Sequence, residues 1–219
     1  MRFEDANDLL KPGYLPFESG YQDLGDDKRV VAGLTRMPGC RAKMVDWWFS
    51  WLGDIEWYRL WHPTDHVYSG WENRVNGKYI GGSHLVHEYL AGKDGPLYKL
   101  RVDFHDPAET FDSAKYKASG HFAVCAHVGQ LESRISDGRM THFIRNTDYG
   151  CEMRSRFWLG EVSHRDATVT IPEAEASKLR AHLDQEFARR LHQHCVEEMG
   201  YLAEILPTLY RRVTLDNTF

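Results

Sequence analysis

A histidine and a glutamate near the C-terminus, His194 and Glu198, have the spacing of two metal ligands on one helix. Helical periodicity extends from about Glu173 to Leu206. At about 100° per residue, both side chains fall in the middle of the apolar stripe of this helix. The stripe consists of Leu183, Phe187, Leu191, Leu202 and Ile205. A buried carboxylate without a partner is strongly unfavourable, so the pair predicts a compensating partner.

Two partners satisfy this requirement. A divalent metal ion is one, because a His-x-x-x-Glu pair presents an imidazole and a carboxylate on the same helix face. The other is a plain hydrogen bond between the buried His194 and Glu198. The helix by itself leaves both open.

Further histidines lie where an expected helix over about residues 41–60 gives way to a strand. Gly53 is a plausible stop within this helical region. Pro63 disfavours helix at His62, which predicts a turn from His62 to His66. A His-Pro-x-x-His turn is chemically suggestive, but alone it is a weak signal, because solvent-facing histidines are common.

The middle of the chain is typical of an antiparallel sheet. Turn signals, of which Asn76-Gly77 is the strongest, separate apolar runs of strand length. The strand candidates are residues 67–72, 79–90, 97–105, 121–128, 140–145, 151–159 and 167–171. A long helix from about Glu173 follows and is expected to stop before Pro207. A curved antiparallel sheet around a long C-terminal helix fits this order, with a ligand cavity between them.

Alternation along the strands assigns side chains to faces. Glu88 shares one face of its strand with His84, Val86 and Leu90. His142 lies on an apolar face and is expected to point inward. Arg154 and Trp158 share the opposite face of their strand, which is either a polar cavity lining or the solvent face.

Composition narrows the functional class. The 219 residues carry a net charge of −5 without a basic block, which argues against a nucleic-acid partner. No apolar run is long enough to span a membrane and the first residues are charged, so we expect a cytoplasmic protein without a membrane partner. The four scattered cysteines are expected to be free thiols. We expect an N-terminal extension over residues 1–38 and one domain over residues 39–219.

Four sequence blocks, in this order, carry a resemblance. They are Trp47-Trp48-Phe49, the run from Tyr58 to His66, the run from Gly150 to Trp158, and the run from His194 to Met199. Together they resemble the 2,4-diacetylphloroglucinol hydrolase family, which includes phloretin hydrolase, over about residues 36–212. The resemblance implies a Bet v 1-like (START-like) helix-grip fold of the α+β class. It also implies a Zn²⁺ ion held by two histidines and two glutamates, and hydrolysis of the carbon–carbon bond between an acyl group and a polyphenol ring.

The resemblance also implies roles for individual residues. His194 and Glu198 match the helical ligand pair, and Glu88 is favoured over Glu72 as the first glutamate. A substrate-contacting tyrosine eight residues before the first histidine ligand favours Tyr58 with His66 over His62. His142 is the expected catalytic histidine, moving a proton to the ring carbon as general acid and base. The substrate is then a small aromatic acylphenol.

Two other functional classes compete with the zinc hydrolase. A helix-grip protein that only binds aromatic or lipid ligands predicts no metal and a plain His194–Glu198 pair. A mononuclear iron oxygenase uses two histidines and a carboxylate, although a second glutamate argues against it. The sequence leaves open the acyl group, the roles of Arg154 and Trp158, and whether the protein is a monomer or a homodimer.

Overall fold

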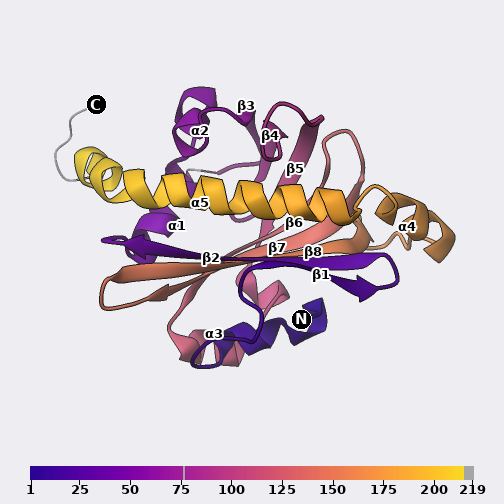
Figure 1. Ribbon diagram of the computed structural model, residues 1–219, viewed down its shortest axis with the longest axis horizontal. Coiled ribbons are helices and arrows are strands. Elements are labelled where there is room, and N and C mark those ends of the chain that lie inside the picture. The colour runs from indigo at the N-terminus through magenta and orange to yellow at the C-terminus, as the bar shows by residue number, and fades with distance from the viewer. Residues whose placement is uncertain (76, 215–219) are drawn as a thin grey trace.

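The computed structural model describes residues 1–75 and 77–214. Within these residues the chain forms one eight-stranded antiparallel sheet with the strand order β1-β2-β8-β7-β6-β5-β4-β3. The long helix α5 (Gln185–Thr214) lies along one face, and the sheet curves around it (Figure 1). This is the expected helix-grip arrangement of a Bet v 1-like α+β fold.

The first six of the seven predicted strands are confirmed, with adjusted ends. The eight strands are β1 (Gly20–Gly25), β2 (Lys28–Pro38), β3 (His66–Glu72), β4 (Ser83–Tyr89), β5 (Leu97–His105), β6 (Phe122–Gln130), β7 (Ile135–Asn146) and β8 (Gly150–His164). The strongest predicted turn involves Asn76, which lies outside the described residues. The bridge between Val75 and Lys78 flanks that position.

Residues 1–38, expected as an extension, contribute two strands to the same sheet. β2 pairs with β8 from Arg29 to Pro38, and β1 pairs with β2 at the sheet edge. Asp26 and Asp27, which link β1 to β2, both have positive φ angles of 53° and 56°. Two consecutive residues with positive φ form the tight type of turn that matches the twist of a hairpin.

The predicted strand over residues 167–171 is wrong. β8 ends at His164, and the Asp166 carboxylate accepts hydrogen bonds from both the backbone N–H and the hydroxyl of Thr168. This local turn replaces strand pairing. Val169, which was expected to be a strand residue, is 45% exposed.

The C-terminal helix also differs from expectation. It is divided into α4 (Glu173–Arg180) and α5. The Asp184 carboxylate accepts a hydrogen bond from the Phe187 N–H, and this cap begins a second helix. α5 does not stop before Pro207 but continues to Thr214. A proline removes only one backbone hydrogen-bond donor from the helix. The turns after Pro207 are held by packing, for example by the edge-on contact of the Tyr210 ring with Trp47.

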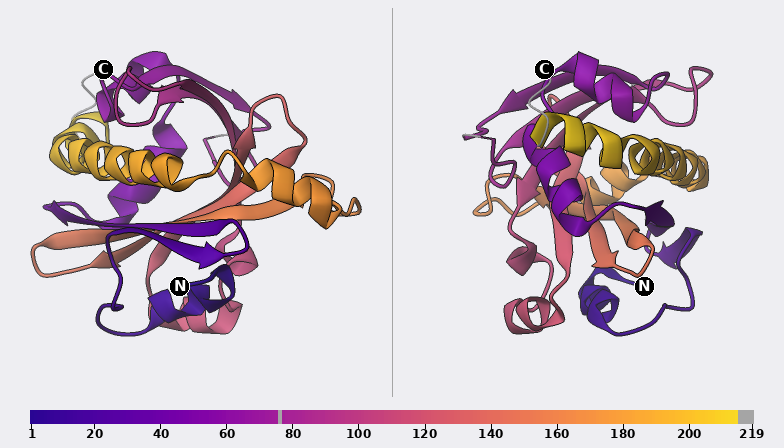
Figure 2. Two further views of the ribbon diagram at one scale, coloured as in Figure 1. Left: turned by 45° about the vertical axis from the view of Figure 1, so that its right-hand side comes forward. Right: turned by 90° about the vertical axis from the view of Figure 1, so that its left-hand side faces the viewer.

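The two faces of the sheet are covered differently (Figure 2). Helices α1 (Ala42–Trp51) and α2 (Ile55–Trp61) lie on the α5 side. The short helices η1 (Phe3–Leu10), η2 (Pro107–Glu109) and α3 (Ser113–Ser119) lie on the other side. Gly33 in β2 allows α5 to approach closely, since a Cβ there would lie 3.2 Å from the Cys195 sulfur.

The face of β8 that carries Arg154 and Trp158 is neither a cavity lining nor a solvent face. It is buried beneath the N-terminal segment that precedes β1, which includes Leu9 and Phe17. Arg154 and Arg156 are fully buried, and both pair with the Glu18 carboxylate at 2.6 Å. The N-terminal segment is therefore held to this face by a buried ion-pair cluster.

Candidate metal centre and cavity

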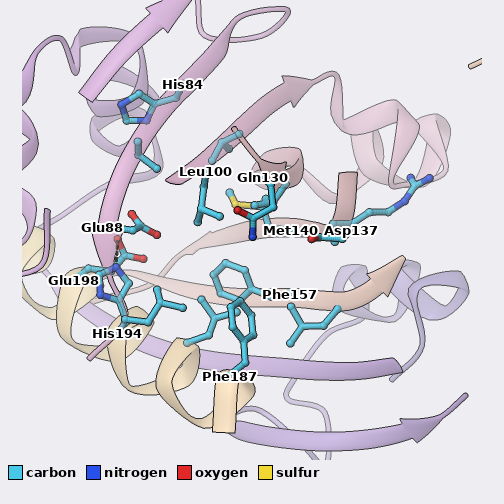
Figure 3. Close-up of a pocket in the computed structure, with 18 of the residues that line it drawn as sticks. His84, Glu88, Leu100, Gln130, Asp137, Met140, Phe157, Phe187, His194 and Glu198 are labelled. Atoms are coloured by element: carbon cyan, nitrogen blue, oxygen red, sulfur yellow. Dashed lines mark ion pairs between the residues drawn. The ribbon is translucent and has the colours of Figure 1, made fainter. Parts of the chain in front are cut away.

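A cavity of about 110 Å³ lies between the sheet and α5 (Figure 3). Its walls are mostly apolar, with Leu100, Phe157 and Phe187 among the lining residues. One end is polar and contains His194, Glu198 and Glu88. An apolar cavity with a few converging polar groups is the usual form of a small-molecule site.

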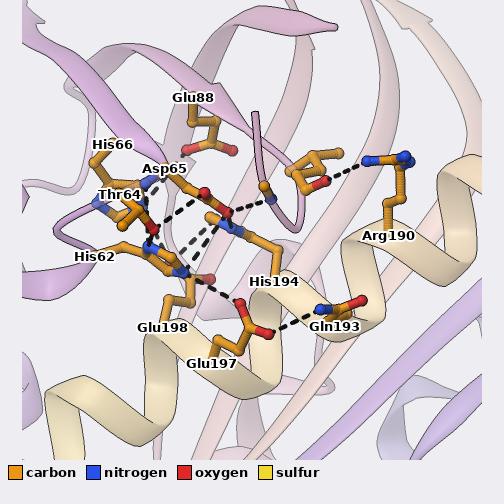
Figure 4. A network of polar contacts seen from close by, with 12 residues as sticks. His62, Thr64, Asp65, His66, Glu88, Arg190, Gln193, His194, Glu197 and Glu198 are labelled. Carbon is orange, nitrogen blue, oxygen red and sulfur yellow. Dashed lines mark hydrogen bonds and ion pairs between the residues drawn. The ribbon is translucent and has the colours of Figure 1, made fainter. Parts of the chain in front are cut away.

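The polar end brings together the four predicted metal ligands from three elements (Figure 4). His66 on β3 and Glu88 on β4 are direct partners in the strand register, and His194 and Glu198 lie one turn apart on α5. Glu198 Oε2 lies 3.7 Å from His66 Nε2 and 3.9 Å from His194 Nε2, and Glu88 Oε2 lies 3.9 Å from His66 Nε2. All four side chains are buried.

The hydrogen bonds of the two histidines fix which ring nitrogen faces the centre. Nδ1 of His66 donates to the Tyr58 carbonyl at 2.8 Å, and Nδ1 of His194 donates to the Asp65 carboxylate at 3.2 Å. Each Nε2 is buried and has no hydrogen-bond partner among the described residues. Metal-binding histidines are typically oriented in this way, with the far N–H held by a carbonyl or carboxylate.

His62, the alternative to His66, has the opposite arrangement. Its Nδ1 accepts a hydrogen bond from the backbone N–H of Asp65 at 3.2 Å. A neutral imidazole carries one proton, so Nε2 of His62 must hold it and has no lone pair for a metal. Like the Nε2 atoms of His66 and His194, this Nε2 has no hydrogen-bond partner among the described residues, but it lies 3.7 Å from the Asp65 carboxylate and 3.5 Å from the Glu197 carboxylate. This geometry favours His66 over His62 as a ligand.

Glu72, the alternative to Glu88, lies away from the cluster. Its carboxylate pairs with Arg101 at 2.7 Å, and its side chain is 51% exposed. Its position at the end of β3 places it on the molecular surface.

Burial and charge shift the proton affinities of the cluster. Burial keeps the pKa of His66 well below its ordinary value, so its imidazole is neutral at pH 7. Burial raises the pKa of Glu198 to about 8. Burial also disfavours charge on His194, but the Asp65 hydrogen bond and the nearby carboxylates outweigh it and raise its pKa to about 9.

These residues fit a zinc ion. Two imidazole nitrogens and two carboxylate oxygens are a donor set that zinc accepts. A tetrahedral ion with bonds of about 2.05 Å has ligand atoms about 3.3 Å apart, and the measured separations of 3.7–3.9 Å are somewhat wider. The fit depends on the Nε2 atoms of His66 and His194, which are buried without a hydrogen-bond partner among the described residues and lie within 4 Å of the Glu198 carboxylate.

The predicted catalytic residues Tyr58 and His142 both line the cavity. The Tyr58 ring stacks on His66 at 3.6 Å, and its hydroxyl donates to Glu88 at 2.5 Å. His142 is 2% exposed, and its Nδ1 lies 2.8 Å from the Ser155 hydroxyl. Burial lowers the pKa of His142 to about 3, so its imidazole is neutral at pH 7.

The sequence as a whole matches one protein-family model, described as the DAPG hydrolase PhiG domain, over residues 1–211. The chain belongs to the DAPG hydrolase family. A 2,4-diacetylphloroglucinol hydrolase of a Pseudomonas species is 30% identical over 95% of this chain and 76% of its own length. Phloretin hydrolase of Eubacterium ramulus is 26% identical over 95% of this chain and 77% of its own length.

Two solved structures are similar in fold to this DAPG hydrolase family member. The Zhui aromatase/cyclase of Streptomyces sp. R1128 has a TM-score of 0.44 at 13% identity, and covers 88% of this chain and 99% of its own. Protein SA2116 of Staphylococcus aureus has a TM-score of 0.46 at 8% identity, and covers 83% and 98%. Separately, none of the helices in the described residues is long and apolar enough to span a membrane.

Two residues of this DAPG hydrolase family member were missed as functional candidates. Asp65 orients His194 and lies in the turn just before His66, where strand alternation gives no signal. His84 was assigned to the Glu88 face but given no role. It lines the cavity, stacks on Trp71 and lies 2.8 Å from the Ser69 hydroxyl through Nε2. Burial lowers its pKa to about 3.

Proposed function

We propose that this protein is a zinc-dependent hydrolase that cleaves the carbon–carbon bond between an acyl group and a polyhydroxylated aromatic ring. The products are a carboxylic acid and the deacylated phenol. Membership of the DAPG hydrolase family supports the reaction class. The observation that carries zinc dependence is the pair of buried, unpartnered Nε2 atoms of His66 and His194, which face the carboxylates of Glu88 and Glu198.

The four ligands would hold the ion at the polar end of an otherwise apolar cavity. Zinc supplies Lewis acidity toward a carbonyl or phenolate oxygen and lowers the pKa of water that it binds. The apolar walls, which include Phe157 and Leu100, bind the ring and acyl group and exclude bulk water. Tyr58 holds the Glu88 carboxylate through its hydroxyl hydrogen, and the same oxygen can accept a hydrogen bond from a ring hydroxyl.

His142 has the proton-transfer role. A proton passes from a phenolic hydroxyl to the ring carbon that carries the acyl group, and His142, whose imidazole lines the cavity, is the side chain that relays it. Water then adds to the acyl carbon and the carbon–carbon bond breaks. The electron pair of that bond restores the aromatic ring, one proton of the water passes to the phenolate oxygen, and the acyl group leaves as the carboxylic acid. The Ser155 hydroxyl on Nδ1 and the Phe49 ring beside the imidazole hold His142 in one orientation.

Elemental analysis of protein purified without added metal tests the proposal. We expect about one zinc per chain in the wild type and none in Glu198→Ala, with carboxylic acid released from acylated phloroglucinols only by the zinc-loaded protein. Glu204→Ala is the matched control, because Glu204 lies on the same helix but is exposed. Iron in place of zinc would favour an oxygenase. No metal after zinc is offered would favour a protein that only binds aromatic ligands.

A further inference from the structure

A second hollow, here called the outer groove, lies on the face of the sheet opposite the cavity, over β5, β6, β7 and the end of β8. It has a volume of about 990 Å³, and its lining includes His105, His127 and Arg139. Arg139 belongs to this outer face, because its guanidinium lies over the ring of Phe3 in η1, 4.4 Å from the centroid. None of the four candidate metal ligands lines the outer groove.

His105 carries an unused hydrogen-bond acceptor in this groove. The side chain is buried, and its Nδ1 donates to the Asp106 carbonyl at 3.0 Å. A neutral imidazole carries one proton, so Nε2 of His105 holds a lone pair. That Nε2 is buried and has no hydrogen-bond partner among the described residues, and no group of potential metal ligands found among them includes His105. A ligand that donates a hydrogen bond would therefore satisfy this atom.

Arg139 carries an unused positive charge in the same groove. Its guanidinium makes no ion pair within the part of the chain that the structure describes, and the groove carboxylate of Asp103 is already paired with two other arginine side chains at 3.0 Å. Burial lowers the pKa of Arg139, and the carboxylates of Glu161 and Glu109 oppose this only in part. An anionic group on a ligand would compensate the charge, and the fork of N–H donors on arginine suits a carboxylate.

We propose that the outer groove binds a small aromatic hydroxy acid, with its carboxylate on Arg139 and its hydroxyl donating to Nε2 of His105. The strands of these residues, β7 and β5, are two strand spacings apart, on the order of 10 Å, with His127 of β6 between them. The two polar groups must therefore lie at opposite ends of a rigid ligand, as in 4-hydroxybenzoate. Apolar side chains such as Val162 and Val169 line the groove beside them and suit the ring.

Matched acids test the outer groove. The probes are 4-hydroxybenzoate, benzoate, which lacks the hydroxyl, and 2-hydroxybenzoate, in which the hydroxyl is beside the carboxylate. Each is titrated into the full chain as purified, and binding is followed by calorimetry and by the ¹⁵N NMR signal of Nε2 of His105. A hydrogen bond between uncharged groups predicts that 4-hydroxybenzoate binds about fivefold more tightly than the other two acids. Only 4-hydroxybenzoate should shift the Nε2 signal as a hydrogen-bond donor does.

Four variants locate the binding. His105→Phe keeps a ring at this position and should abolish the preference, whereas the matched control His121→Phe, which alters a histidine outside the groove, should retain it. Arg139→Gln should weaken binding of all three acids by about tenfold or more. Leu100→Trp, which fills the cavity on the other face of the sheet, should leave their binding unchanged.

Three results would overturn the outer-groove site. They are failure of the wild type to bind 4-hydroxybenzoate or to prefer it, a preference that survives His105→Phe, and loss of binding in Leu100→Trp, which would place the acid in the cavity instead. Thermal melts show which variants are folded. If His105→Phe does not fold, the order of the three affinities and the shift of the Nε2 signal in the wild type decide.

Discussion

Replacing Asp65 with asparagine should weaken zinc binding without removing any of the four ligands. The buried Asp65 carboxylate accepts the Nδ1 hydrogen of His194 at 3.2 Å and the Gly92 N–H at 3.2 Å. Burial acts to raise the pKa of Asp65, but these hydrogen bonds outweigh it and lower the pKa, so the group is an anion at pH 7. Asparagine keeps the shape and one acceptor oxygen but removes the charge.

The magnitude follows from the type of bond that is lost. A hydrogen bond to a charged group contributes about 1.5–3 kcal/mol, and a neutral one about 1 kcal/mol. The exchange should therefore cost about 0.5–2 kcal/mol, or roughly 2- to 30-fold in zinc affinity. This range overlaps the about 10- to 100-fold typical of losing the partner that orients a metal-binding histidine.

The assay is competition for zinc against a chromophoric chelator at fixed pH. Asp94→Asn is the matched control, because Asp94 is 74% exposed and pairs with Arg190 on the surface. Thermal melts in chelator should show that Asp65→Asn is folded. If the folded Asp65→Asn protein binds zinc as tightly as Asp94→Asn, then Asp65 does not act through His194.

Three further outcomes are expected. Zinc affinity should rise between about pH 6 and 8, by one to two log units per pH unit. Zinc must displace protons from His194 and Glu198, because the pKa values of these residues are raised to about 9 and 8. A zinc affinity that does not change with pH in chelator titrations would contradict this. Glu18→Gln should lower the free energy of unfolding by about 3 kcal/mol in urea titrations, because two buried guanidinium groups lose their carboxylate. His142→Ala should keep its zinc, and its rate of acid release should fall by about 10²-fold or more, which is the contribution of a general acid–base group. A zinc-loaded variant with full activity would refute the role of His142.

Helical periodicity was sufficient to bring His194 and Glu198 together, because their relation is local to one helix. The alternation of side chains along each strand likewise placed Glu88 and His142 on the cavity side. The choice of His66 over His62 needed more, since it depends on which ring nitrogen meets a backbone N–H and which meets a carbonyl. The sequence does not contain that geometry.

Two other features were missed for physical reasons. β2 was not predicted because Val30, Val31 and Ala32 are all fully buried, so the strand lacks the alternation of a half-exposed one. The environment of Arg154 was left open because its partner Glu18 is 136 residues away in the sequence. Alternation gives the face of a side chain but not what covers that face.

The charges around the cluster support the proposed cation site. The buried carboxylates of Asp65, Glu88 and Glu198 share a small volume with imidazoles that burial tends to keep neutral. Without a metal, protons relieve this excess of negative charge, which is why the pKa values of Glu198 and His194 are both raised. A divalent ion can replace those protons and use the two unpartnered Nε2 atoms at once. A plain His194–Glu198 pair would leave His66 Nε2 buried without a partner, so the metal accounts for more of the site than the hydrogen bond does.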